Sequence, residues 1–301
     1  MDYAKNRISM RALSGTKAPN LAADPIIHHP SVRKMLLTQK AVTEGGRSMI
    51  YECALLQDQM SEANLRGDKA EAKRIDDRMG FLTPILKGFL TEIGIECTSL
   101  GIQVYGGHGY IASNQQEQIM RDIRIATVWE GTTQIQALDL LARKILLQKL
   151  KPINHHCDLI SQYCFEVALK GAGRRTRWHA LTLWMKAKQW QILSLRIASR
   201  AIKDREAIGM ASVEYLMYAG YISLAYHWLK MEVAAEAALA NKTPSDHALD
   251  PAFYQAKIDV AYFYFENLLP RTEWLHQAML APTDSVMAMP RDSFSFDHSR
   301  G

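Results

Sequence analysis

The 301-residue sequence has few of the features that mark secreted or membrane-spanning proteins. It contains only four cysteines, too few for a disulfide-stabilised scaffold in a chain of this length, so buried reduced thiols are expected. No run of about eighteen uninterrupted apolar residues occurs, so no transmembrane segment is predicted. The charged start from Met1 to Arg11 lacks an apolar core, so no signal peptide is predicted. Together these absences predict a cytoplasmic protein.

Strong charge and metal-binding motifs are also lacking. The formal net charge is +5, without a long run of Lys and Arg or a known nucleic-acid motif, so no nucleic-acid partner is predicted. A mildly basic chain can still attract an anionic ligand. His155, His156, Cys157 and Cys164 match no standard zinc spacing, so no metal site is predicted.

Alternating strand-like segments are absent, and apolar residues instead recur at helical spacing. Between Val32 and Met60 they form one stripe at about 100° per residue, which is typical of a long amphipathic helix. The fold class predicted is all-α. Helices are expected over 32–60, over 66–79, from Pro84 (after a Thr83 N-cap) to the Gly106–Gly107 pair, and over 118–125, 132–150, 157–204 with a break at Gly171 and Gly173, 210–240 and 251–270.

Loops and a domain boundary are predicted between these helices. A loop is expected through Asn114, another over 241–250, and irregular structure from Pro282 onward. The segment Lys151–Asn154 is the best candidate boundary, which divides the chain into domains 1–151 and 152–301.

The segment from Gln103 to Gln136 holds the residues best suited to chemistry. Gly106, Gly107 and Gly109 allow a backbone to approach a ligand closely, although such a turn more often simply ends a helix. Glu130 precedes Gly131 in a turn between apolar residues and a helix start. A carboxylate there is either a base or an ordinary helix-terminal residue, and spacing alone leaves both interpretations open.

The ordered combination of these motifs resembles the C-terminal motif block of acyl-CoA dehydrogenases. Tyr3, Ala4, Arg7 and Arg11 resemble the Tyr-Ala-x-x-Arg segment that opens the C-terminal helical domain of that family. The segments 22–30 and 32–37 resemble a large-subunit subgroup that includes 3-methylmercaptopropionyl-CoA dehydrogenases and related fatty acyl-CoA dehydrogenases. The matching residues of the main block are Gln103, Gly106, Gly107, Gly109, Tyr110, Arg121, Asp122, Arg124, Glu130, Gly131, Thr132, Gln134, Ile135 and Gln136.

The resemblance implies a four-helix-bundle-like domain over 1–151, followed by an extra helical domain over 152–301. The family's N-terminal helical domain and β-domain have no counterpart in these residues. It also implies α,β-dehydrogenation of an acyl-CoA to a trans-2-enoyl-CoA, with Glu130 as the base that removes the α proton and hydride transfer to N5 of FAD. A water-poor pocket would strengthen that carboxylate as a base.

Further roles follow from the resemblance by matching positions. The expected partners are an acyl-CoA substrate, electron-transfer flavoprotein as electron acceptor, and further copies of the chain in a homodimer or homotetramer. Trp129 and Gly131 are expected at the substrate; Trp129 is equally compatible with ordinary packing. Residues expected to contact FAD, in part the FAD of a neighbouring subunit, are Arg7, Gln103, Gly106, Gly107, Thr132 and Gln134.

Other residues of the block are expected to be structural. Arg121 and Asp122 are expected to form an ion pair that fixes the catalytic turn, and His108 is expected to face solvent. Met10 differs from the family's usual residue near the adenosine. Three interpretations of the chain stay open: a working part of a dehydrogenase, a subunit completed by a partner chain with the missing domains, and an inactive remnant that folds and oligomerises.

Overall fold

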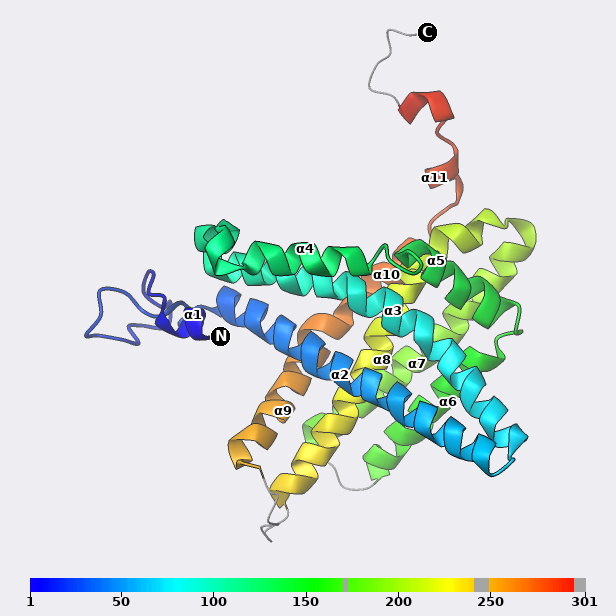
Figure 1. Ribbon diagram of the computed structural model, residues 1–301, viewed down its shortest axis with the longest axis horizontal. Coiled ribbons are helices and arrows are strands. Elements are labelled where there is room, and N and C mark those ends of the chain that lie inside the picture. The colour runs from blue at the N-terminus through cyan, green and yellow to red at the C-terminus, as the bar shows by residue number, and fades with distance from the viewer. Residues whose placement is uncertain (170–172, 241–248, 295–301) are drawn as a thin grey trace.

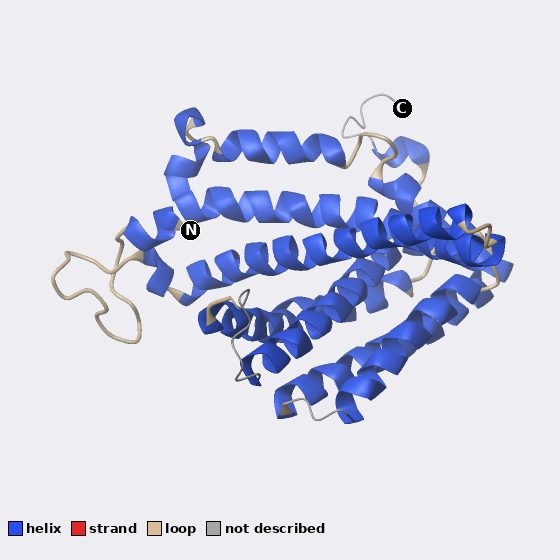
Figure 2. Cartoon of the chain, turned by 60° about the horizontal axis from the view of Figure 1, so that its bottom comes forward, coloured by secondary structure: helices blue, strands red, loops and turns tan. Residues whose placement is uncertain are grey.

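The computed structural model describes residues 1–169, 173–240 and 249–294. Over these ranges the chain forms helices and turns, with one isolated antiparallel bridge between Ile8 and Pro25 and no strand longer than that (Figure 2). This confirms the all-α prediction. None of the helices in the described ranges is long and apolar enough to cross a membrane.

Long helices dominate the arrangement (Figure 1). The α-helices are α1 (Asp2–Asn6), α2 (Pro30–Leu65), α3 (Lys69–Tyr105), α4 (Gln116–Ala126), α5 (Thr133–Leu138), α6 (Lys151–Leu169), α7 (Arg174–Lys203), α8 (Glu206–Ala240), α9 (Pro251–Phe263), α10 (Thr272–Met279) and α11 (Asp284–Met287). Two π-helical segments, η4 (Asp139–Leu146) and η5 (Tyr264–Leu268), and five 3₁₀ turns, η1 (Ile26–His28), η2 (Gly106–Tyr110), η3 (Ala112–Asn114), η6 (Leu269–Arg271) and η7 (Arg291–Phe294), join them.

The predicted helix start at Thr83 is wrong, because α3 runs through Pro84 without a break. Asp68 is the N-cap instead, and its carboxylate accepts a hydrogen bond from the Glu71 N–H at 3.0 Å. A proline inside a helix costs about 3 kcal/mol. Pro84 is buried between Leu82 and Ile85, and α3 packs along α2 on both sides of it, so burial of apolar area outweighs that cost.

Several other helix ends differ from the sequence-based prediction. The helix predicted over 132–150 is split into α5 and the π-helical segment η4, which ends at Leu146. The turn that follows contains Lys149 and Leu150, whose φ angles are +52° and +63°. α6 then begins at Lys151 rather than at residue 157. The predicted break is confirmed at Gly173, the N-cap of α7, whereas Gly171 lies outside the described residues. α9 ends at Phe263, and α10 was not predicted as a separate helix. Most of the predicted loop over 241–250, residues 241–248, lies outside the described residues.

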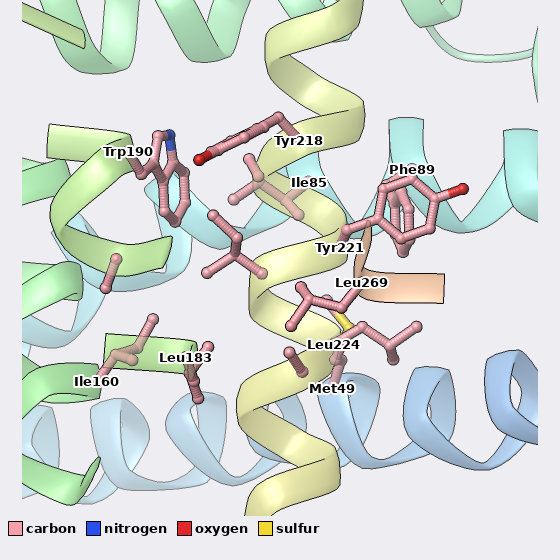
Figure 3. Close-up of a cluster of buried hydrophobic side chains, with 14 of the residues drawn as sticks. Met49, Ile85, Phe89, Ile160, Leu183, Trp190, Tyr218, Tyr221, Leu224 and Leu269 are labelled. Atoms are coloured by element: carbon pink, nitrogen blue, oxygen red, sulfur yellow. The ribbon is translucent and has the colours of Figure 1, made fainter. Parts of the chain in front are cut away.

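Helix α8 lies at the centre of the core. Its sequence is apolar on every side, the pattern of a helix surrounded by others rather than lying on a surface. It packs against α2, α3, α5, α7, α9 and α10. Figure 3 shows α8 side chains, including Tyr218, Tyr221 and Leu224, packed against Phe89 of α3 and Trp190 of α7.

One core cluster contains residues from both sides of the predicted boundary at residue 151. Leu140 and Leu141 lie on one side of it and Trp190 and Leu216 on the other, all with no exposed side-chain area. The division into domains 1–151 and 152–301 therefore stays a prediction.

Close approach of α3 and α8 depends on glycine. A Cβ built on Gly220 of α8 would lie 2.0 Å from Cγ of Phe89, whose side chain is fully buried. No real side chain tolerates such a distance, so either the helices or the phenyl ring must move. The absence of a side chain at Gly220 therefore sets how closely α3, the helix that leads into the Gly106 turn, packs on the core.

Replacing Gly220 with Ala is expected to lower the free energy of unfolding by about 2 kcal/mol through overpacking. Urea denaturation followed by circular dichroism measures it. Gly209→Ala is the matched control, because a Cβ there meets nothing within 4 Å on the same helix. That control should gain about 0.5–1 kcal/mol from the lower entropy of the unfolded chain. Equal stability of the two variants would contradict the predicted clash.

Candidate functional site

Glu130 lies in the exposed turn between α4 and α5, in an unusual backbone conformation. Its φ angle is +49°, and Gly131 follows at +100°. A non-glycine residue in the left-handed region costs about 1–2 kcal/mol. The turn is nonetheless held on both sides, because the Trp129 N–H donates to Ile125 O at 2.9 Å and the Thr133 N–H donates to Thr127 O at 3.2 Å.

Two charged side chains of α3, which the sequence interpretation missed, brace this turn. The Lys87 ammonium donates to the carbonyl oxygen of Gly131, and the Thr133 hydroxyl donates to Glu92 Oε1 at 2.5 Å. Both charged residues are only partly exposed within an otherwise apolar stretch of α3. A charged residue isolated within an apolar stretch is the sequence feature that could have indicated this bracing role.

Thr132 and Gln134 follow Glu130 at the start of α5. Thr132 is the N-cap of α5, and its hydroxyl oxygen accepts from the Ile135 N–H at 3.4 Å, while Gln134 is exposed. Gln136 Nε2 donates to Glu130 O at 3.5 Å. These bonds fix the backbone on the C-terminal side of Glu130.

Apolar side chains surround the turn and are open to solvent in this chain. Trp129 is 64 % exposed, and Val128, Ile125 and Ile135 are each about half exposed. The described residues therefore do not enclose the Glu130 carboxylate by themselves. Such a group of large apolar side chains beside a strained turn is typical of a surface that other protein covers.

The glycine turn lies at the other end of α4. α3 ends at Tyr105, and Gly106 takes a φ of +60°, as predicted for a helix terminator. Gly107 follows it, and a Cβ built on either glycine meets nothing within 4 Å, so the backbone there is open to a ligand. Gln103 is exposed one turn earlier.

Helix α1 brings Arg7 to this end of the molecule. The Tyr3 ring stacks on Tyr105 with centroids 4.1 Å apart, and the Tyr3 hydroxyl bonds to His108 Nδ1 at 2.8 Å. His108 is exposed, as predicted, but it also anchors α1. Arg7 follows α1 directly, is exposed, and forms no ion pair among the described residues.

The loop after Arg7 is organised around a buried carboxylate. Asp24 is fully buried and accepts from the backbone N–H groups of Ala12, Lys17 and Ala18 at 2.7–2.9 Å, and from Arg11 Nη1 at 3.2 Å. The N–H bonds, that of Ala12 foremost, hold the pKa of the Asp24 carboxyl well below its usual range, although burial opposes them. Met10 in this loop is exposed, with a φ of +59°.

The candidate site residues therefore fall into two groups rather than one. Figure 1 shows α4 beside α3, with the turn at Gly106–Asn114 at one end and the turn that contains Glu130 at the other. The eleven residues of α4 separate the groups by about 16 Å. Arg7, Gln103, Gly106 and Gly107 form the first group; Trp129, Glu130, Gly131, Thr132 and Gln134 form the second.

One predicted contact of the block is wrong. Asp122 does not pair with Arg121 but accepts from Gln118 Nε2 at 2.6 Å, because both side chains lie on the same face of α4 one turn apart. No group of three metal-ligating side chains occurs in the described part of the chain. The cysteines are free, and burial raises the pKa of the Cys97 thiol to about 12, so the thiol stays protonated at neutral pH.

Two family models match the chain and together cover most of it. Residues 7–146 match the acyl-CoA dehydrogenase C-terminal domain, and residues 159–290 match the acetyl-CoA dehydrogenase C-terminal-like domain.

Curated relatives match over nearly the whole chain. A 3-methylmercaptopropionyl-CoA dehydrogenase of Ruegeria pomeroyi is 33% identical over 288 residues, which are 95% of this chain and 46% of the relative. A broad-specificity linear acyl-CoA dehydrogenase of Mycobacterium tuberculosis is 28% identical, over 98% of this chain and 48% of the relative. The chain thus spans slightly less than half the length of these relatives.

Solved structures share the fold. An acyl-CoA dehydrogenase of Bacillus anthracis, complexed with FAD, matches with a TM-score of 0.66 at 18% identity, over 93% of this chain and 44% of that one. ACDH-11 of Caenorhabditis elegans, in complex with C11-CoA, matches with a TM-score of 0.61 at 20% identity, over 99% of this chain and 43% of that one.

Proposed function

The chain belongs to the acyl-CoA dehydrogenase family, and we propose that it forms the C-terminal part of an FAD-dependent enzyme that converts an acyl-CoA into a trans-2-enoyl-CoA. The observation that supports this most is the strained, doubly braced turn that holds Glu130 at a φ of +49°. Backbone strain of this kind is concentrated at functional positions.

Glu130 is the proposed base that removes the α proton of the acyl-CoA. Lys87 and Thr133 hold the turn through Gly131 O and Glu92, so the carboxylate projects from a fixed backbone. A fixed position contributes to catalysis because the reacting atoms need not be reoriented. Trp129 and Gly131 flank the base and are proposed to contact the substrate, Trp129 through its exposed ring.

The residues of both groups suit a flavin nucleotide. Arg7 offers an unpaired guanidinium, Gln103 an exposed amide, and Gly106 and Gly107 an unhindered backbone, a donor set that fits a pyrophosphate. Thr132 and Gln134 would hold FAD at the other end of α4. When bound, the flavin supplies the redox chemistry, by accepting a hydride from the β carbon.

The separation of the two groups along α4 bears on assembly. Because α4 holds them about 16 Å apart, a second copy of the chain can supply one group to a site built on the other. We therefore propose a homodimer or homotetramer. A cytoplasmic location and electron-transfer flavoprotein as electron acceptor are also part of the proposal.

Acyl-CoA-dependent bleaching of the visible flavin band tests the proposal. A protein that combines this chain with an N-terminal helical domain and a β-domain is expected to bind FAD and to bleach anaerobically with octanoyl-CoA or palmitoyl-CoA. Flavin that binds but is not reduced by either acyl-CoA would contradict a dehydrogenase and favour an inactive remnant. If the chain alone bound stoichiometric flavin and was reduced, no partner chain would be needed.

A further inference from the structure

Helix α7 has a composition unlike that of any neighbouring helix. Its sequence contains eight Lys and Arg residues and no Asp or Glu. It is also rich in large apolar residues, including three tryptophans. No acid on α7 itself neutralises this charge, although Lys186 pairs with Glu273 of α10 and Lys188 with Asp158 of α6.

Both faces of α7 are apolar. The inner face packs on α6 and α8 and includes Leu183, Trp190 and Ile197, which are at most 1 % exposed. The opposite face is apolar as well, although nothing in the described part of the chain covers it. Its large side chains recur at helical spacing and are 44–86 % exposed: Trp178, Leu181, Met185, Ile192, Leu195 and Ile202. We call these six residues the outer stripe.

The outer stripe continues onto the neighbouring helix. Phe165 and Leu169 of α6 are 65 % and 70 % exposed. Between the two helices lies a shallow apolar cavity of about 250 Å³, lined by Phe165, Leu181, Trp184 and three smaller side chains. The apolar area is therefore larger than the scattered exposed residues of an ordinary surface.

Unpaired cations border the outer stripe along its length. Arg174, Arg177, Arg196 and Lys203 form no ion pair or side-chain hydrogen bond within the described ranges. Arg175 lies over the Tyr262 ring at 4.2 Å. Among the acids near the start of α7, Glu236 bonds the Gly173 N–H and Thr176, and Glu232 bonds His179, whereas Glu266 lines a cavity together with Arg174 and Arg177.

From this arrangement we propose that α7 and the end of α6 dock on the surface of a membrane that contains anionic lipids. A helix with exposed Trp and Leu side chains flanked by Arg and Lys lies in the plane of the interface, with its apolar residues in the acyl boundary and its cations at the headgroups. From Trp178 to Ile202 the outer stripe is about 36 Å long, so it can lie along the interface as one continuous apolar line.

Charge argues against a second copy as the occupant of the outer stripe. A symmetric dimer through the outer stripe would bring the unpaired cations Arg174, Arg177, Arg196 and Lys203 of one copy against the same four of the other. Anionic headgroups, by contrast, complement the four cations that have no acid partner in the described ranges, Arg174, Arg177, Arg196 and Lys203.

Sedimentation with vesicles tests the proposal on the 301-residue chain. The chain is expected to sediment with phosphatidylcholine vesicles that contain a third phosphatidylglycerol, more weakly at high salt, and not with pure phosphatidylcholine. Failure to sediment with the anionic vesicles would overturn the proposal.

Variants distinguish binding through the outer stripe and its cations from non-specific adsorption to vesicles. Arg174→Glu with Arg177→Glu should weaken partitioning about fivefold or more per cation. Trp178→Ser with Leu181→Ser should weaken it at least tenfold. Tyr51→Ser with Leu65→Ser is the matched control, since these α2 residues are 68 % and 90 % exposed.

Two further results would overturn the proposal. One is binding that the α7 variants leave unchanged while circular dichroism shows them folded. The other is a chain that does not sediment with vesicles but forms a dimer, if the same variants dissociate that dimer. This result would assign the outer stripe to contact with a second copy.

Discussion

Replacing Glu130 with Gln is expected to lower the rate of acyl-CoA oxidation by about 10²–10⁴-fold while flavin stays bound. Loss of a positioned base typically costs this factor, or about 3–5 kcal/mol of transition-state stabilisation. The amide has nearly the shape of the carboxylate, so the turn held by Lys87 and Thr133 should keep its geometry. Anaerobic stopped-flow measurement of flavin reduction in the complete enzyme gives the rate directly.

The strained backbone at Glu130 supplies a second variant and separates function from stability. Glu130→Gly should lower the rate of flavin reduction at least as much as Glu130→Gln. It should nevertheless raise the free energy of unfolding by roughly 1 kcal/mol, because glycine adopts a φ of +49° without strain. Glu117→Gln, which is partly exposed in the first turn of α4 and so at the far end of that helix from Glu130, should leave the reduction rate unchanged. A Glu130→Gln enzyme with unchanged turnover would exclude Glu130 as the base.

The sequence indicates candidate site residues, whereas their arrangement depends on tertiary contacts. The order of motifs between Gln103 and Gln136 indicates these candidates, because each motif is local in the sequence. Their division into two groups depends on α4 lying along α3, which is a tertiary contact. The bracing of the turn by Lys87 and Glu92 likewise joins residues more than forty positions apart, as 44 separate Lys87 from Gly131.

The fold was predictable from the sequence where the spacing of apolar residues matches the face of the helix that the structure buries. The helical content and the approximate bounds of α8 along the chain followed from patterns of apolar residues. Pro84 was misread as a helix start because local propensity disfavours an internal proline, whereas packing of α3 on α2 overrides it. The left-handed conformation of Lys149 and Leu150 could not be predicted from the sequence, because neither is the glycine or asparagine that usually takes that conformation.

Removing the carboxylate of Glu52 should have the largest effect on stability. Glu52 of α2 bonds His227 Nε2 of α8 at 2.8 Å and also pairs with Arg78 of α3, while His227 Nδ1 bonds the Ser48 hydroxyl at 2.8 Å. The side chains of Glu52 and His227 are only 16 % and 5 % exposed. Glu52→Gln leaves Arg78 without its counter-charge in a largely buried place, which should cost roughly 3 kcal/mol.

Stability should also depend on pH through this network. Burial alone raises the pKa of the Glu52 carboxyl, but the hydrogen bond from His227 and the surrounding positive charges outweigh it and lower the pKa from 4.5 to about 2. Because the folded state lowers this pKa, the contribution is complete above pH 4.5 and is lost as the pH falls toward 2. The difference between wild type and Glu52→Gln in urea denaturation should therefore shrink over that interval.

Glu62→Gln, which loses an exposed pair with Arg66 on the same helix, should cost at most about 0.5 kcal/mol at any pH. If the two variants were equally stable at neutral pH, the three-helix network would contribute no more than a surface ion pair.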